Sequence, residues 1–276
     1  MSVPGSGATG SSVIGSGAAG ARVTDSSATG ACVPGSSATG ACVPDSSATG
    51  ACVTDPSATG PGVLGPNPAE PGHGDLLERL RRVDLPTLGH LLEEGFVGSA
   101  IRRLGQPRRM AGTAATLALD APDATAVNRA LVALRPGEVL VVDMGGDHTH
   151  APIGAVTAAA ARARGAAGIV VDGVVTDVDA LTDPRSGMPV HARGTSCLTT
   201  KRLDGRGGRR QVPVEIGGVR IAPGDIVLGD ANGVIALPPT SLAAVVHEAE
   251  LSDAAEPDLI RRIRAGEDLR TLLHLG

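Results

Sequence analysis

The sequence predicts an α/β domain with a β-rich appendage, preceded by a low-complexity tract, and three observations support this prediction. A ten-residue unit repeats through residues 5–64. Beyond about residue 74, apolar segments of helical or strand-like period are separated by turn signals. Between residues 110 and 194 these segments follow the order strand, helix, strand, helix, strand, which is typical of parallel strands joined by right-handed crossovers.

The repeat tract consists of units such as DSSATGACVP and GSSATGACVP. Each unit offers too few apolar side chains to offset the roughly 1 to 2 kcal/mol that ordering each backbone residue costs. We therefore predict that residues 1–70 are disordered. We interpret the tract either as expanded repetitive sequence translated from an upstream start codon or as an adhesive or linker segment. Cys32, Cys42 and Cys52 recur only with the unit, so they do not indicate a metal site.

Composition argues against several classes of protein. Phe96 is the only aromatic residue and the formal net charge is −5, whereas proteins that bind single-stranded nucleic acid use aromatic faces and positive charge. No apolar run reaches the roughly 18 to 20 residues needed to span a bilayer, and the N-terminus lacks the layout of a signal peptide. We therefore expect a cytoplasmic protein with no nucleic acid partner and no membrane association.

The first elements of the domain follow from hydrophobic periodicity. Residues 76–95 have helical spacing with a break at Pro86. Residues 110–119, MAGTAATLAL, alternate like a strand, and residues 124–134 have the spacing of a helix. Residues 135–143, RPGEVLVVD, indicate a turn followed by a buried strand.

The later elements complete the predicted sheet and add a helical C-terminus. Residues 154–165, GAVTAAAARARG, predict a helix of small residues that can approach a sheet closely. Residues 167–173 and 187–194 predict two further strands. Short β-rich runs over residues 211–238 are broken by Gly, Pro and Asp, as in an antiparallel cluster. The C-terminal segment has helical spacing, and we expect an interruption at Pro257.

Candidate functional residues follow two of the predicted strands. In open α/β sheets, ligands bind beyond the carboxyl ends of the strands, where helix N-termini present free N–H groups. The first strand end supplies Asp143 and a helix start at Gly154, and the second supplies Asp172, Asp177 and Asp179. A carboxylate such as Asp177 suits a hard cation like Mg²⁺. The alternative for each aspartate is a structural role, as a loop cap or a solvated side chain.

The loop before the same predicted helix contains Asp147, His148 and His150 in the sequence DHTH. Imidazole and carboxylate ligands suit zinc or iron, so this loop is a second candidate metal site. The alternative is a solvated polar loop. The residue types alone leave both interpretations open.

Several catalytic mechanisms lack their sequence signatures. Schiff-base chemistry requires a lysine, and the one lysine, Lys201, lies in a polar segment without signs of desolvation. The chain has no GxSxG, GxxxxGK[ST] or strand-linked GxGxxG motif. Cys197, in RGTSCLTT, is interpreted as a passive small side chain because no electropositive neighbourhood is indicated.

The chain resembles the RraA-like family over residues 76–272, in segments that follow the family's order and spacing: PGEVLVVDMGG, GAVTAAAARARGAAGIVVDGVVTDVDAL, PVHARGTS, TTKR, VPVEIGGVRIAPGDIVLGDANGVIALP and IRAGEDL. This family includes the metal-dependent 4-hydroxy-4-methyl-2-oxoglutarate / 4-carboxy-4-hydroxy-2-oxoadipate aldolases and the regulator of ribonuclease E activity. The resemblance implies a swivelling β/β/α fold and a homotrimer with active sites between subunits. We accordingly divide the chain into the repeat tract (1–70), an RraA-like domain (71–240) and C-terminal helices (241–276) that pack on the domain or on a neighbouring subunit.

The resemblance also implies a substrate-binding turn. In the aldolases of the family, a Gly-led turn binds the pyruvate carboxylate through its backbone N–H groups. The residues of this sequence that correspond to it are Gly154, Ala155, Val156 and Thr157.

Three further family positions correspond to residues after the next strand or in the last helices. The metal-binding Asp of the family corresponds to Asp177, which is implied to be the catalytic metal ligand. The family's Arg, which contacts substrate, falls on Thr176, and its first acid falls on Ala155, so both are substituted. A Glu from the neighbouring subunit's C-terminal helix corresponds loosely to Glu256.

The function implied by the resemblance is that of a divalent-metal-dependent lyase, with Mg²⁺ as the metal. It would cleave 2-oxo acids like 4-hydroxy-4-methyl-2-oxoglutarate to pyruvate and decarboxylate oxaloacetate as a side activity. Because Thr176 supplies only a neutral hydrogen bond in place of a charged one, we expect weakened activity. The alternative is a non-catalytic trimeric binding or regulatory protein that has kept the fold.

Overall fold

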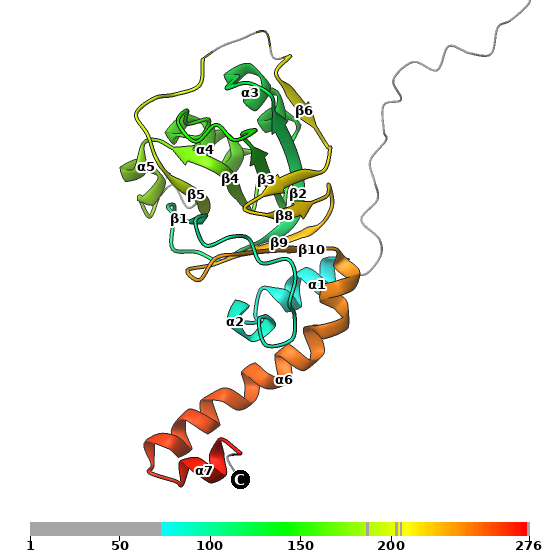
Figure 1. The fold of residues 1–276 in the computed structure, drawn as a ribbon, viewed down its shortest axis with the longest axis vertical. Coiled ribbons are helices and arrows are strands. Elements are labelled where there is room, and N and C mark those ends of the chain that lie inside the picture. The colour runs from blue at the N-terminus through cyan, green and yellow to red at the C-terminus, as the bar shows by residue number, and fades with distance from the viewer. Residues whose placement is uncertain (1–72, 186–187, 202–203, 205, 275–276) are drawn as a thin grey trace, which may run out of the picture. The chain divides into compact units, whose positions relative to one another are not determined.

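The computed structural model describes residues 73–185, 188–201, 204 and 206–274, so the predicted disordered tract of residues 1–70 lies outside the described residues. A mixed eight-stranded sheet forms the centre of the described chain (Figure 1). In spatial order its strands are β1 (Arg102–Arg103), β5 (Val190–Thr195), β4 (Gly168–Val175), β3 (Glu138–Asp143), β2 (Met110–Leu119), β9 (Ile226–Gly229) and β10 (Val234–Leu237), with β6 (Gly208–Arg210) paired to β2.

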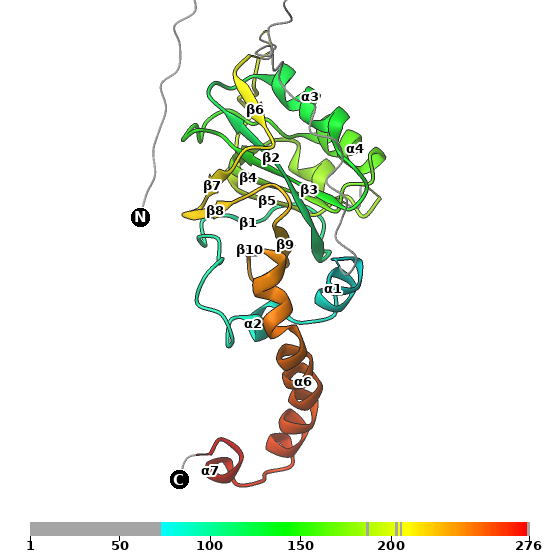
Figure 2. The same ribbon diagram turned by 90° about the vertical axis from the view of Figure 1, so that its right-hand side faces the viewer.

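Strands β2, β3, β4 and β5 are parallel, as the sequence predicts. The helices between them are α3 (Ala124–Ala133), α4 (Ala155–Ala163) and α5 (Val178–Thr182). Figure 2 shows α3 and α4 on one side of the sheet, and the hairpin of β7 (Val214–Ile216) and β8 (Val219–Ile221) on the other. Because both faces are covered, β3 and β4 bury nearly all of their residues, which explains their continuous apolar runs.

The sheet is nearly closed on itself. β1 pairs with β5 at one end of the strand order. Just before β1, the N–H of Val97 donates to the carbonyl oxygen of Val234 at 3.0 Å, and the N–H of Ala236 donates to that of Gly95 at 2.9 Å. The segment that leads into β1 therefore also pairs with β10 at the other end of the sheet, which leaves little exposed strand edge there.

Three apolar clusters form the core. The first lies between the sheet and helices α3 and α4, and the second lies between the opposite face of the sheet and the β7–β8 hairpin. The third joins β9 and β10 to the helices at the two ends of the described chain. The small residues of α4, such as Ala158 and Ala161, are buried, so this helix packs closely on the strands beneath it, as the run of alanines predicts.

The first and last helices pack together at one end of the sheet. They are α1 (His73–Leu80), α2 (Leu85–Leu88) and α6 (Pro239–Arg264), and α6 is followed by α7 (Leu269–Leu272). Arg79 on α1 donates to both carboxylate oxygens of Glu250 on α6, at 2.9 and 2.7 Å. Beyond this contact α6 extends away from the sheet (Figure 1). Within the described ranges, no helix is both long and apolar enough to cross a bilayer.

The predicted interruption at Pro257 is wrong, because α6 runs through this residue without a break. A proline inside a helix removes one N–H donor, so the carbonyl four residues earlier loses its partner. Residues 254–258 are exposed, and water can satisfy that carbonyl. One turn earlier, the carboxylate of Asp253 accepts hydrogen bonds from the N–H of Asp84 and the hydroxyl of Thr87, which fixes the helix to α2.

One buried histidine gives the fold a predictable pH dependence. His191 on β5 is fully buried; its Nε2 lies 2.8 Å from the Asp230 carbonyl oxygen, and its Nδ1 has no hydrogen-bond partner among the described residues. Burial lowers the pKa of His191, and the bond to Asp230 opposes this only in part. The unfolded chain therefore binds a proton that the folded chain excludes. We expect stability to fall as the pH drops below about 6.5, by up to about 1.4 kcal/mol per pH unit.

The measurement is urea unfolding at pH 7.5 and at pH 5.0 for wild type and His191→Gln, whose amide nitrogen can keep the bond to Asp230. The variant should lose most of the difference in unfolding free energy between the two pH values. His90→Gln is the matched control, because His90 is exposed. An unchanged pH dependence in His191→Gln would show that other groups cause it.

Candidate functional site

A tight turn precedes α4 and is fixed to the end of β4. Ile153 pairs with Val175 in an isolated parallel bridge, and the N–H of Thr176 donates to the carbonyl oxygen of Ile153 at 2.9 Å. Gly154 is the N-cap of α4. The hydroxyl of Thr157 accepts from the Gly154 N–H at 2.7 Å and donates to the Gly154 carbonyl oxygen at 3.0 Å. The turn is therefore held by the sheet on one side and by its own helix on the other.

Asp177 follows β4 and faces this turn. Its backbone is left-handed, with φ of 56°, a conformation that Asp and Asn adopt more readily than most residues. Its Oδ2 accepts a hydrogen bond from the N–H of Ala155 at 2.9 Å, and the Thr176 hydroxyl lies 3.4 Å from Oδ1. A carboxylate at a helix N-terminus is favoured by the free N–H groups and the helix dipole. The turn and the carboxylate, predicted as parts of one site, are thus in direct contact.

Gly154 is required by the closeness of this contact. A Cβ atom at Gly154 would lie 2.5 Å from Oδ2 of Asp177 and 2.7 Å from Cγ2 of Thr176. We expect Gly154→Ala to displace the Asp177 carboxylate, to destabilise the protein by about 1 to 3 kcal/mol, and to weaken Mg²⁺ or Mn²⁺ binding at least tenfold. Unfolding curves and metal titrations would measure both effects. Gly74→Ala is the control, because its Cβ would meet nothing within 4 Å.

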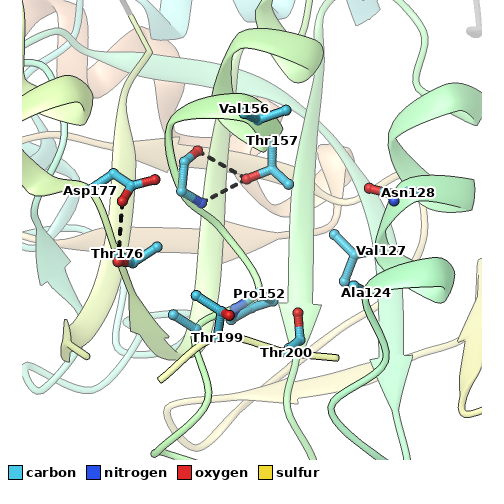
Figure 3. A pocket seen from close by; sticks show the side chains of 12 residues that line it. Ala124, Val127, Asn128, Pro152, Val156, Thr157, Thr176, Asp177, Thr199 and Thr200 are labelled. Atoms are coloured by element: carbon cyan, nitrogen blue, oxygen red, sulfur yellow. Dashed lines mark hydrogen bonds between the residues drawn. The ribbon is translucent and has the colours of Figure 1, made fainter. Parts of the chain in front are cut away.

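A pocket of about 190 Å³ opens beside the turn. Figure 3 shows Thr176 and Asp177 on one side of it and Asn128 of α3 across from them. The described residues that line it are Ala124, Val127, Asn128, Ala151, Pro152, Gly154, Val156, Thr157, Thr176, Asp177, Thr199 and Thr200. The predicted site residues Gly154, Val156, Thr157, Thr176 and Asp177 all line this pocket, and Ala155 joins them through its bond to Asp177.

Sequence reasoning missed the opposite wall of the pocket. Ala124, Val127 and Asn128 come from the first turns of α3, and Ala151 and Pro152 from the loop before Gly154. Asn128 is one of three polar residues in this helical segment, with Thr125 and Arg129, and nothing in the sequence distinguished it. Thr199 and Thr200 belong to the TTKR segment, one of the segments that resemble the family. This resemblance was the one feature of the sequence that could have indicated residues of that wall.

Asp143 and Asp172 lie on the opposite face of the sheet from the pocket. They are register partners on β3 and β4, and they alternate with residues of the first core cluster. Asp172 is not at a strand end, because β4 continues to Val175. Its carboxylate accepts from the N–H of Gly217 in the hairpin at 2.7 Å and pairs with Arg193. These contacts favour the structural interpretation of Asp172, and Asp143 has a similar role because it accepts from the N–H of Gly145 at 2.8 Å.

The DHTH loop forms a turn that is bonded within itself. Asp147 accepts from the N–H and hydroxyl of Thr149 and from the N–H and Nδ1 of His150, at 2.6 to 3.1 Å. Burial raises the pKa of Asp147, but these hydrogen bonds outweigh it and leave the pKa well below its usual range. His148 lies 3.6 Å from Asp172. The carboxylate of Asp147 and Nδ1 of His150 are therefore already engaged within the loop, which favours the interpretation as a polar loop.

The remaining candidates of the sequence lie outside the pocket. Asp179 on α5 and Glu256 on α6 are exposed. Lys201 is exposed, and its backbone N–H and carbonyl bond to Pro122 and Ala124. Cys197 is exposed with a free thiol. Among the described residues that line the pocket, none of these four is present.

Asp177 determines which kind of metal the pocket suits. It is the one carboxylate among the described lining residues. Mg²⁺ is commonly held by one or two carboxylates and keeps several waters, whereas a structural zinc site needs four protein ligands. An exposed single carboxylate beside an open pocket therefore fits a hydrated divalent cation of the Mg²⁺ type.

Sequence comparison relates the chain to known proteins. The profile of the RraA-like family, described as Aldolase/RraA, matches residues 87–236. A protein of Halalkalibacterium halodurans named as a 4-hydroxy-4-methyl-2-oxoglutarate aldolase is 35% identical over 156 residues, which cover 56% of this chain and 72% of the relative.

Structure comparison finds the same fold in solved proteins. An uncharacterized protein from Pseudomonas syringae pv. tomato superposes with a TM-score of 0.63 at 26% identity, covering 74% of this chain and 94% of that one. The RNA-processing inhibitor RraA from Thermus thermophilis superposes with a TM-score of 0.51 at 29% identity, covering 56% of this chain and 92% of that one.

Proposed function

Because the chain belongs to the RraA-like family, we propose that it is a divalent-metal-dependent lyase that cleaves small 4-hydroxy-2-oxo acids to pyruvate. Oxaloacetate decarboxylation is the proposed side activity. The observation that carries the proposal is the contact between Asp177 and the Gly154 turn at the wall of one pocket. In this proposal the Asp177 carboxylate holds the cation, and the backbone N–H groups beside it hold a substrate carboxylate.

Each part of the site has a role in this proposal. The N–H groups of Val156 and Thr157 at the start of α4 lack partners within the helix and orient the substrate carboxylate, whereas those of Gly154 and Ala155 are bonded to Thr157 and Asp177. Thr157 holds the shape of the turn through its two bonds to Gly154. Asp177 holds the cation, and Thr176 donates a neutral hydrogen bond beside it. When bound, the cation supplies Lewis-acid stabilisation of the negative charge that develops as the carbon–carbon bond breaks.

We further propose a homotrimer whose neighbouring subunit completes the pocket. Val156 lines the pocket and is 82% exposed in the single chain, and Leu198 next to Thr199 is 45% exposed. Apolar side chains at a pocket mouth gain stability when a neighbour covers them. Sedimentation equilibrium over a range of concentrations would test the trimer, and a monomer at all concentrations would contradict it.

The test of the lyase is pyruvate release by the full chain from 4-hydroxy-4-methyl-2-oxoglutarate and from oxaloacetate, with Mg²⁺ and with a chelator. Turnover that the chelator abolishes, and that exceeds the rate of free Mg²⁺, supports the proposal. A folded protein without turnover on any 4-hydroxy-2-oxo acid would contradict it.

The alternative is a binding or regulatory protein that has kept the fold. Two observations favour it: Ala155 and Thr176 carry no ionisable group, and the Thermus relative is named for inhibition of RNA processing. This alternative predicts that pyruvate binds to the folded chain while no substrate is cleaved.

A further inference from the structure

The wall of the pocket opposite Asp177 combines the apolar side chains of Ala124 and Val127 with neutral polar groups. Asn128 on α3 faces the pocket from the side across from Thr176 and Asp177, and Thr199 and Thr200 lie between the two sides (Figure 3). Asn128 thus lies on the opposite side of the pocket from the Asp177 carboxylate, where the end of a substrate that does not take part in bond cleavage would lie.

These three side chains have unused hydrogen-bonding capacity. Within the part of the chain that the structure describes, the amide of Asn128 and the hydroxyls of Thr199 and Thr200 make no side-chain hydrogen bond, although Thr200 bonds Ala151 through its backbone. By contrast, the Thr157 hydroxyl is fully engaged with Gly154. One amide and two hydroxyls are thus available to a ligand, and each can both donate and accept.

The charge of the lining argues against a second carboxylate at this end. Among the described lining residues, Asp177 is the one ionisable side chain, and it is negative. On the walls that the described residues of one chain supply, a carboxylate on the far end of a substrate would find a neutral amide and hydroxyls instead of a guanidinium or an ammonium. Charged hydrogen bonds are roughly twice as strong as neutral ones, so the wall offers a dicarboxylate little compensation for its desolvation. A hydroxyl group is itself neutral, so a neutral amide or hydroxyl is a suitable hydrogen-bond partner for it.

We propose that the pocket selects a 2-oxo acid whose far end is uncharged and carries hydroxyl groups, bound by Asn128, Thr199 and Thr200. This rests on the proposed lyase function. The probe is 4,5,6-trihydroxy-2-oxohexanoate, a six-carbon acid. The cavity volume of about 190 Å³ lies below the roughly 300 to 1,000 Å³ of pockets for drug-sized ligands, which suits a short acid and not a nucleotide.

The reaction of this probe balances without any oxidant or reductant. The bond between C3 and C4 breaks, and the C4 hydroxyl loses its proton as C4 becomes an aldehyde carbon. The electron pair of the broken bond passes to the pyruvate fragment, and C3 takes up one proton. The products are pyruvate and glyceraldehyde.

The test compares kcat/KM of the full chain with Mg²⁺ on the trihydroxy acid and on 4-hydroxy-4-methyl-2-oxoglutarate. We expect at least a tenfold preference for the trihydroxy acid. Asn128→Ala and Thr200→Val should each lower kcat/KM for the trihydroxy acid by about 10- to 100-fold, because each leaves a substrate hydroxyl unpaired. Both should change the value for the dicarboxylate less than threefold. Thr195→Val, an exposed threonine outside the pocket wall, is the matched control.

The outcomes separate this inference from the lyase proposal. A preference for the dicarboxylate, or equal losses on both substrates in the two variants, would overturn the inference and leave the lyase intact. If neither substrate is cleaved, the lyase proposal fails, and calorimetric titration of the two acids decides the inference by binding alone. Tighter binding of the trihydroxy acid, lost in Asn128→Ala, supports it, and tighter binding of the dicarboxylate overturns it.

Discussion

Replacing Asp177 with asparagine is expected to lower Mg²⁺-dependent pyruvate release by about 1000-fold or more. The metal contributes several kcal/mol of charge stabilisation, and each 1.36 kcal/mol corresponds to about a factor of ten in rate. Asparagine is the informative replacement for two reasons. It tolerates the left-handed backbone at this position, and its amide oxygen can still accept the hydrogen bond from Ala155. The fold should therefore survive while the negative charge is lost.

Three measurements check this prediction: pyruvate release, a Mn²⁺ binding titration and the melting temperature. Metal affinity and turnover should fall together while the melting temperature stays within a few degrees. Asp179→Asn, in the next turn and exposed, is the matched control and should behave like wild type. Retained metal affinity in Asp177→Asn would show that the cation binds elsewhere. His148→Ala and His150→Ala would then be tested at the DHTH loop.

The double variant Thr176→Arg, Ala155→Asp is expected to have a higher kcat/KM for 4-hydroxy-4-methyl-2-oxoglutarate than wild type, by about 100- to 1000-fold. The arginine supplies a charge-assisted, bidentate contact to a carboxylate in place of a single neutral hydrogen bond. One positioned electrostatic donor commonly changes a rate by this factor. The aspartate adds an acid at the first position of α4, where the helix N-terminus favours negative charge.

The two single variants show whether the residues act together. Thr176→Arg alone should recover part of the rate on the dicarboxylate, and Ala155→Asp alone should recover little. The side chain of residue 176 lies against the turn, as the closeness of Thr176 Cγ2 to Gly154 shows, so the arginine begins at the correct wall of the pocket. A folded double variant without any gain would indicate that the pocket has diverged beyond these two positions.

The sequence predicted the type and the approximate bounds of the central helices and strands, because the residue types and the apolar spacing of a segment depend on how that segment is buried. MAGTAATLAL was predicted as a strand and forms β2 at Met110–Leu119, although β2 is buried on both faces and not on alternate residues. The spacing of residues 124–134 predicted α3 to within one residue. Pro257 was misinterpreted because a local rule was applied without knowing exposure: on an exposed helix the lost bond is small enough to leave the helix continuous. The strand predicted over residues 167–173 is β4, which extends two residues farther, to Val175.

The candidate site was predicted on one side only. Asp177 and the Gly154 turn stand in sequence segments that family resemblance identifies, and the structure places them in contact. Asn128 reaches the pocket only because α3 packs beside α4 on the sheet. That proximity comes from tertiary packing and has no signature in the residues around Asn128. Thr199 and Thr200 are placed likewise by the loop after β5, which passes Ala151.

Two backbone contacts of the turn also affect the entropy of ligand binding. They are the hydrogen bond from Thr176 to Ile153 and the bridge between Ile153 and Val175. A binding loop that orders around its ligand loses conformational entropy at that moment. Here the turn is tied to a buried strand, so most of that entropy is lost when the protein folds. The amide hydrogen of Thr176 should accordingly exchange with solvent about as slowly as those inside β4. Its exchange rate should change little when pyruvate binds.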